Sequence, residues 1–156
     1  MTRWLSDDEQ AAWRAWVAAA MLLPDRLSRD LQDEKGFTLA DYEILMRLSE
    51  APRRRMRMSE LADATLSSRS RLSHQVDRLA SAGLVDREAC EDDRRGFFAV
   101  LTAKGWRTVV DAAPTHVESV RRHLVDVLTP AEFAELGRLC RKVADAARAD
   151  AAESCG

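Results

Sequence analysis

Cysteine, glycine and proline are all scarce in this 156-residue sequence, which contains three, six and four of them. Three widely spaced cysteines with no CxxC pair argue against a disulfide framework or a zinc finger. So few glycines and prolines argue against a loop-rich or disordered chain. Because 46% of the residues are hydrophobic and 32% are charged, the chain can bury a core and still present a well-solvated surface.

Membrane and export signals are missing as well. The longest apolar run, residues 16–23, is far shorter than the roughly 20 residues that a helix needs to cross a bilayer. The N-terminus lacks the basic start and the apolar core of a signal peptide. We therefore expect a cytoplasmic protein with no membrane partner.

Patterns typical of enzymes and metal sites are also missing. The sequence has no Ser–His–Asp order, no Gly-rich phosphate loop and no paired carboxylates in a plausible cleft. His116 and His123 are too far apart on one expected helix to bind the same ion directly. Cys90 lies among acidic residues, which disfavour a thiolate, and Cys140 falls on an apolar stripe typical of packing. We expect no enzyme activity, no cofactor, no metal and no redox sensing.

Charge is distributed unevenly, although the net charge of −2 gives no hint of a polyanionic partner. Between residues 53 and 78 the sequence carries many more arginines than acids. The arginines are Arg53, Arg54, Arg55, Arg57, Arg69, Arg71 and Arg78, and the acids are Glu60, Asp63 and Asp77. A local basic face attracts phosphate even when the whole chain is acidic. The alternative is an ordinary solvated run of charges.

The hydrophobic pattern and the capping residues predict a mainly α-helical chain with one small β-hairpin. Helices are expected to begin at caps formed by Ser6, Thr38, Ser59, Ser68, Thr102 and Thr129. The first should end at Gly36 and the fourth at Gly83. A basic loop is expected at 53–55. The fifth helix carries a heptad seam from Trp106 to Val127 and should kink at Pro114.

The hairpin is expected from two β-compatible runs, 84–89 and 97–101, on either side of the charged tip 91–96. It follows directly after a short helix, a turn and a second helix. This order predicts a winged helix-turn-helix, which reads DNA by laying its second helix in the major groove.

The predicted DNA contacts lie on the second helix of this pair, just before it, and at the hairpin tip. Arginine pairs well with guanine, and a basic tip suits the minor groove. The alternative is that Arg94 and Arg95 pair with nearby acids in solvent. The predicted DNA-binding residues are Arg57, Ser68, Arg69, Ser70, Arg71, Ser73, His74, Arg78, Asp93, Arg94 and Arg95.

These motifs resemble the MarR family of transcriptional regulators. The resemblance rests on the segments 58–62, 68–72, 76–79 and 83–85 and on a wing signature, D-x-R-x5-L-T-x-x-G. Asp93, Arg95, Leu101, Thr102 and Gly105 match this signature in full. The turn 64–67 departs from the pattern, because many members have a glycine there, and we expect different local dihedral angles in it.

The resemblance implies a homodimer and a three-part organisation. Residues 1–36 and 103–156 would form dimerisation helices, and 37–102 would form the DNA-binding domain. Such a dimer would bind double-stranded DNA at a pseudo-palindromic operator, with half-sites about 34–36 Å apart. The resemblance also implies Arg95 in the minor groove, residues 68–74 in the major groove, and repression as the usual mode of action.

Members of the family are often released from DNA by a small phenolic or other aromatic ligand. By resemblance, Trp13, Trp16, Met46 and Trp106 would line the ligand pocket. The simpler interpretation is that these four are ordinary core residues at helical spacing. Two further alternatives stay open: a DNA binder without an effector, and a winged-helix dimer that contacts other proteins.

Overall fold

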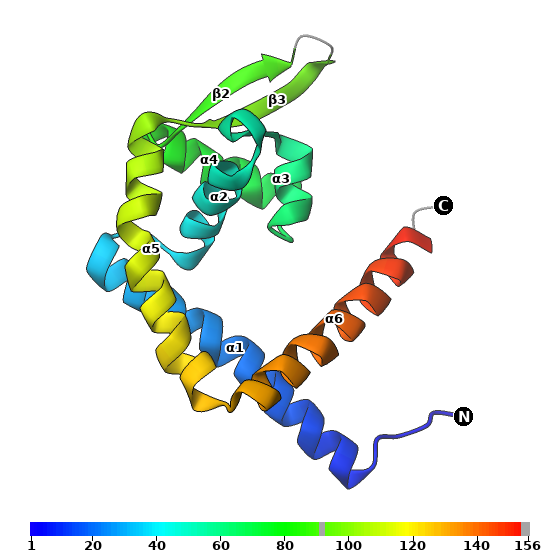
Figure 1. The fold of residues 1–156 in the computed structure, drawn as a ribbon. Helices are drawn as coiled ribbons and strands as arrows, with labels where there is room; N and C mark the ends of the chain where they lie inside the picture. Colours follow the sequence, from blue (N-terminus) through cyan, green and yellow to red (C-terminus); the bar gives the residue numbers. More distant parts are fainter. Residues whose placement is uncertain (91–92, 154–156) are drawn as a thin grey trace. The chain divides into compact units, whose positions relative to one another are not determined.

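The computed structural model describes the backbone of residues 1–90 and 93–153 and the side chains of 1–90 and 96–149. The chain divides into two compact units, Met1–Val117 and Glu118–Gly156. Helices dominate, with one small sheet, as the sequence predicts (Figure 1). Its elements are α1 (Asp7–Lys35), α2 (Leu39–Glu50), η1 (Pro52–Arg54), β1 (Arg55–Arg57), α3 (Met58–Ala64), α4 (Arg69–Ser81), β2 (Val85–Cys90), β3 (Asp93–Leu101), α5 (Ala103–His123), η2 (Val125–Val127) and α6 (Pro130–Glu153).

The first two helices begin at the predicted caps. Ser6 and Glu9 form a reciprocal capping box, in which each side chain accepts a hydrogen bond from the backbone amide of the other residue. Thr38 and Asp41 do the same at the start of α2. Gly36 ends α1 in the left-handed conformation, with φ of 79°. These three local signals were predicted correctly.

The helix-turn-helix is present with two corrected boundaries. Ser59 was predicted to cap α3, but Arg57 occupies the cap position, two residues earlier, and the helix starts at Met58. The carboxylate of Glu60, at the third helical position, accepts the backbone amide of Arg57 at 3.2 Å, which is the carboxylate's half of a capping box. Ser68 caps α4 as predicted, and its hydroxyl accepts from the Arg71 amide at 3.2 Å. The last residue of α4 is Ser81, two residues before Gly83.

The sheet has three strands rather than the predicted two. Its order is β1-β3-β2, and both pairs are antiparallel. The predicted hairpin is present as β2 and β3, which lie side by side at one end of the unit 1–117 (Figure 1). The interpretation of Arg55 as part of a basic loop was wrong, because Arg55–Arg57 pair with Val100, Ala99 and Phe98.

A single hydrophobic core joins the end of α1, helices α2 to α4, the sheet and the first half of α5. The buried side of α4 consists of Leu72, Val76 and Leu79, three of the four residues predicted to form it. The other core members include Leu31, Ile44, Leu45, Leu48, Leu61, Val85, Ala99, Leu101, Val109 and Ala112. Because this side of α4 is pinned in the core, the opposite side faces solvent.

The C-terminal part of the chain also carries a correction. The heptad seam was predicted to continue to Val127, but α5 ends at His123 and Val127 lies in the short helix η2. The helix α5 runs through Pro114. Thr129 and Glu132 form the predicted start of α6, with the Glu132 carboxylate accepting the Thr129 amide at 2.8 Å. Cys140, predicted to be packed, is exposed. No helix among the described residues is long and apolar enough to cross a membrane.

Candidate nucleic-acid interface

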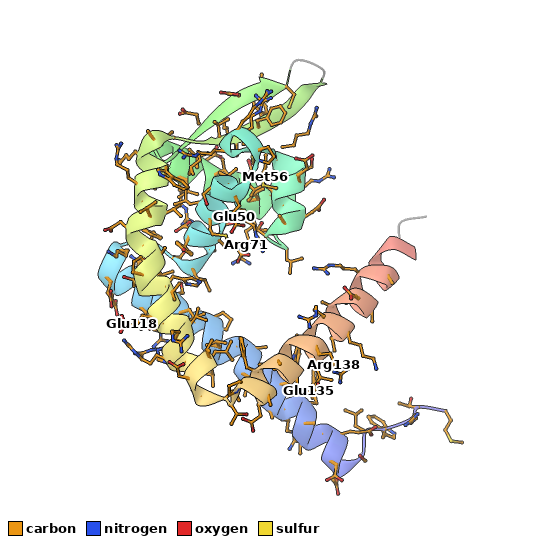
Figure 2. The ribbon with its side chains drawn as sticks, in the orientation of Figure 1. Glu50, Met56, Arg71, Glu118, Glu135 and Arg138 are labelled. Carbon is orange, nitrogen blue, oxygen red and sulfur yellow. The ribbon has the colours of Figure 1, made fainter. Side chains whose placement is uncertain are left out.

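The outer side of α4 is polar along its whole length. Its buried side holds Leu72 and Val76 at 0% exposure, so the helix is fixed against rotation about its own axis. Arg71, labelled in Figure 2, lies in the first turn of the helix. The exposed residues of this helix and its cap that were predicted to bind DNA are Ser68, Arg69, Ser70, Arg71, His74 and Arg78.

The turn before α4 has the geometry of a Schellman motif. The Ser67 amide donates to Ala62 O at 2.9 Å, and the Leu66 amide donates to Asp63 O at 3.3 Å. Leu66 occupies the left-handed position, with φ of 51°, which glycine favours. Its side chain is 82% exposed. The turn therefore holds a leucine in a conformation that glycine adopts without strain.

Arg78 is held by a buried carboxylate. Its Nη2 atom lies 2.8 Å from Asp41 Oδ1, and Asp41 is only 7% exposed. The other oxygen of Asp41 accepts the Thr38 amide and hydroxyl at the start of α2. The ion pair therefore ties α4 to the start of α2, and the guanidinium of Arg78 is already committed to one partner.

Ser73 faces the sheet rather than solvent. Its hydroxyl accepts a hydrogen bond from Arg87 Nη2 at 3.0 Å, and its carbonyl accepts from the same nitrogen at 3.3 Å. Arg87 Nη2 also lies 3.0 Å from Asp77 Oδ1. Arg87 was not predicted as a site residue. No local sequence signal marks it, because its partners lie on another element.

The predicted residues gather in two hollows, one on each side of α4. A cavity of about 510 Å³ lies between α3, α4 and the sheet. It is lined by Arg57, Arg69 and Arg87, and no carboxylate is among its described lining residues. A second hollow, of about 710 Å³, is lined by Ser68, Ser70, Arg71, His74 and Arg78 together with residues at the start of α2. The structure thus brings together every predicted DNA-binding residue whose side chain it describes.

Three predicted wing residues, Asp93, Arg94 and Arg95, have side chains outside the described residues. Their backbone forms the start of β3. At the base of the wing, Thr102 joins the end of β3 to the turn that follows α4. The Thr102 hydroxyl donates to Gly83 O at 2.8 Å and accepts from the Gly105 amide at 2.9 Å.

The residues predicted to line a ligand pocket lie in separate surroundings within the chain. Trp13 and Trp16 stack on each other at 5.3 Å and are both about half exposed. Met46 packs against the core. Trp106 lies under the guanidinium of Arg54, 4.0 Å from the ring centroid. The cavity of about 380 Å³ beside Trp106 is lined otherwise by residues of α5 alone, among those described.

Comparison with known proteins decides the family. The crystal structure of AbsC, a MarR family transcriptional regulator from Streptomyces coelicolor, superimposes with a TM-score of 0.88. It is 52% identical in sequence, and the match covers 95% of this chain and 99% of that one. The chain belongs to the MarR family.

Further comparisons agree with this membership. The model of the MarR family matches residues 35–96. Sco3205, a MarR family regulator from the same organism solved in complex with DNA, has a TM-score of 0.90 and 46% identity over 94% of this chain and 91% of its own. BpsR of Bordetella bronchiseptica, whose DNA binding is regulated by 6-hydroxynicotinic acid, shares the fold at 21% identity and a TM-score of 0.79, over 92% of this chain and 99% of its own. No curated protein matches significantly.

The wing signature of this MarR family chain has a steric explanation in its second half. A Cβ atom on Gly105 would clash with the carbonyl oxygen of Leu84 and with the Leu101 side chain. Leu101 is buried, and Thr102 closes the turn between β3 and α5. The L-T-x-x-G part of the signature therefore holds α5 directly against the end of the helix-turn-helix.

Proposed function

We propose that this MarR family regulator binds a pseudo-palindromic operator in double-stranded DNA as a homodimer and represses transcription. The observation that carries the proposal is the exposed first half of α4, where arginine, serine and histidine side chains lie opposite a fully buried apolar side. Such a helix end suits the major groove, because arginine pairs with guanine and the serine and histidine groups adapt to other bases.

The wing is proposed to contact the minor groove through Arg95. Replacing Arg95 by alanine is expected to weaken operator binding. The slope of the logarithm of the binding constant against the logarithm of salt concentration should fall by about one, because one positive charge close to the DNA phosphates is lost. Titrations at several salt concentrations measure both quantities. Full affinity in the variant would remove the wing tip from the mechanism.

Base reading is proposed for Arg71 and His74, which line the second hollow, of about 710 Å³. Among the described interactions, neither side chain forms a hydrogen bond or an ion pair with the rest of the protein. Their replacement by alanine should change sequence preference more than overall affinity. Binding selections with wild type and each variant measure this difference. A uniform loss over all sequences would assign both residues to phosphate contacts.

Release by a small aromatic ligand is proposed as the regulatory input. The exposed stacked pair Trp13 and Trp16, and Trp106 beside its cavity, offer aromatic surfaces that planar ligands favour. Tryptophan fluorescence during titration with aromatic acids, with operator release followed in parallel, tests the proposal. A protein whose fluorescence and DNA binding both stay unchanged is a constitutive binder.

The central experiment is selection of genomic fragments by the purified protein, followed by footprinting. The proposal expects a protected pseudo-palindrome whose half-sites are about one helical turn apart. Protection of a single half-site would contradict dimeric binding, and failure to select any sequence would favour the protein-interaction alternative. Transcription from the selected operator, with and without the protein, then distinguishes repression from activation.

A further inference from the structure

Arg87 connects the wing, which consists of β2 and β3, to α4, the proposed DNA-recognition helix. It lies in β2 and is paired with Ala99 of β3, whose side chain is fully buried. Residues directly opposite each other in an antiparallel pair share one face of the sheet. The side chain of Arg87 therefore starts on the inner face, over a small residue that leaves it room, and its guanidinium reaches α4.

On α4 the guanidinium meets three acceptors within one helical turn. Nη2 lies 3.0 Å from Ser73 Oγ, 3.3 Å from Ser73 O and 3.0 Å from Asp77 Oδ1. On its other side, the guanidinium carbon lies 5.9 Å from the ring centroid of Phe97. The side chain is 28% exposed, and its Nε is buried without a hydrogen-bond partner among the described residues. Arg87 is thus enclosed between helix and sheet.

We infer that Arg87 is a positioning residue that sets the angle between the wing and the recognition helix. The inference rests on the proposed function. A wing and a helix that enter neighbouring grooves must hold a fixed geometry, because each degree of freedom removed on binding costs affinity. Arg87 removes that freedom before DNA arrives. It acts through Ser73 and Asp77. Ser73 therefore helps to hold the wing against α4 and is not assigned a DNA contact of its own.

The competing role is direct contact with a DNA phosphate, and the two roles predict opposite results for Asp77. If Arg87 positions the wing, removing the Asp77 carboxylate loosens the same junction and weakens DNA binding. If Arg87 binds phosphate, loss of Asp77 releases a cation and removes a nearby negative charge, so binding stays the same or strengthens.

The test uses the intact protein with an operator obtained by genomic selection. Arg87→Gln, Asp77→Asn and the double variant are compared in a double-mutant cycle of DNA affinity at several salt concentrations. We expect each single variant to bind about tenfold more weakly and the double variant to be no weaker than Arg87→Gln. The salt slope should stay at the wild-type value, because no phosphate contact is lost. Arg29→Gln, which breaks the exposed pair with Asp25 on α1, is the matched control and should leave affinity unchanged.

Arg87→Lys separates charge from geometry. A lysine keeps the charge but lacks the planar fork that holds a helix carbonyl and a carboxylate together, so it should recover only part of the affinity. Hydrogen exchange of the free protein adds a readout independent of DNA. Amides of β2 should exchange faster in Arg87→Gln while those of α4 near Leu72 and Val76 keep their protection.

Four results would overturn the inference. They are unchanged affinity in Arg87→Gln, a salt slope lowered by about one, unchanged or tighter binding by Asp77→Asn, and full recovery by Arg87→Lys. If Arg87→Gln does not fold, Asp77→Asn still decides, because its side chain is 58% exposed and tolerates the change. A wild-type protein that selects no DNA would instead refute the proposed function, and the hydrogen-exchange comparison would still report on the junction.

Discussion

At the scale of single residues, the two helices of the helix-turn-helix end in the same kind of turn built with different residues. Both α3 and α4 end in Schellman motifs, with the left-handed position held by Leu66 in one and Gly83 in the other. Glycine occupies that conformation without the steric cost that a Cβ brings. The turn between α3 and α4 therefore carries a backbone strain at Leu66, which the turn after α4 avoids by having Gly83 at the same position.

Replacing Leu66 by glycine is expected to raise the free energy of unfolding by about 0.5–1 kcal/mol, because it relieves the left-handed strain at a side chain that packs against little of the protein. Denaturant titration measures the change. Gly83→Ala is the paired control and should lower stability by roughly 1 kcal/mol, since φ at Gly83 is 72° and a new Cβ would meet only the Lys104 side chain, at an ordinary contact distance of 3.9 Å. A loss of stability in Leu66→Gly would show that the leucine side chain stabilises the turn.

His116 is expected to make the stability of the protein depend on pH. It lies on α5 with its ring 4.7 Å from that of Tyr42, and its Nδ1 is buried without a partner among the described residues. Burial lowers the pKa of His116 below its usual value of 6.5, and the nearby Glu43 offsets only part of this effect. The neutral imidazole is therefore the form that fits the fold.

The sign of the effect follows from linkage. A histidine whose pKa is lower in the folded state leaves stability intact above about pH 6.5 and reduces it as pH falls below that value, because the unfolded chain takes up the proton first. His116→Gln should lose this part of the pH dependence. Thermal melting of both proteins between about pH 5 and pH 8 measures it, and parallel curves would contradict the assignment.

At the scale of elements, Gly105 lies where α5 packs against the backbone of Leu84, just before β2, and against Leu101 at the end of β3. Its missing side chain lets α5 approach the carbonyl of Leu84 directly. Gly105→Ala is expected to lower the free energy of unfolding by about 3 kcal/mol or more, because a backbone atom blocks the new Cβ and the helix has to shift. Gly137→Ala on α6 is the control, since only the mobile end of the Arg141 side chain lies near it. Equal melting of the two variants would show that the junction yields easily.

Elements that depend on local signals were the ones predicted correctly. The caps Ser6, Thr38, Ser68 and Thr129 each act within four residues of the chain, so their pattern is visible in the sequence. The strand β1 was missed because it has three residues, two of them arginines, and exists only through its pairing with β3. The end of α5 was also misplaced, because heptad spacing continued beyond the last helical hydrogen bonds.

In the candidate site, too, the sequence predicted the residues that depend on local spacing and missed the pairings between distant residues. The helix-turn-helix pattern located Ser68, Arg69 and Arg71 because amphipathic spacing separates the buried from the exposed side of α4. The pairings of Arg78 with Asp41 and of Arg87 with Ser73 and Asp77 span 37, 14 and 10 residues. Partners so far apart are joined by the packing of the core, which sequence spacing does not reveal.

At the scale of the whole molecule, large apolar side chains are exposed on each of the helices that the proposed dimer would use. Soluble monomers rarely leave so many such residues in contact with water, so an apolar partner surface is expected to cover them. The exposed residues are Trp13, Trp16, Met21 and Leu22 on α1, Val110 and Val117 on α5, and Leu139 and Val143 on α6.

Replacing Trp16 by glutamate is expected to weaken dimerisation by roughly 30-fold or more, because an aromatic anchor is lost and a charge would be buried. Sedimentation of the variant should show protomers at concentrations where the wild type is dimeric. Since α4 and the wing are untouched, the protomer should keep its fold and bind a single half-site, with the loss of affinity that follows when two linked sites become one. Gln10→Glu adds the same charge at another exposed position of α1 and should stay dimeric. A Trp16→Glu protein that remains dimeric and protects both half-sites would move the dimer interface away from this part of α1.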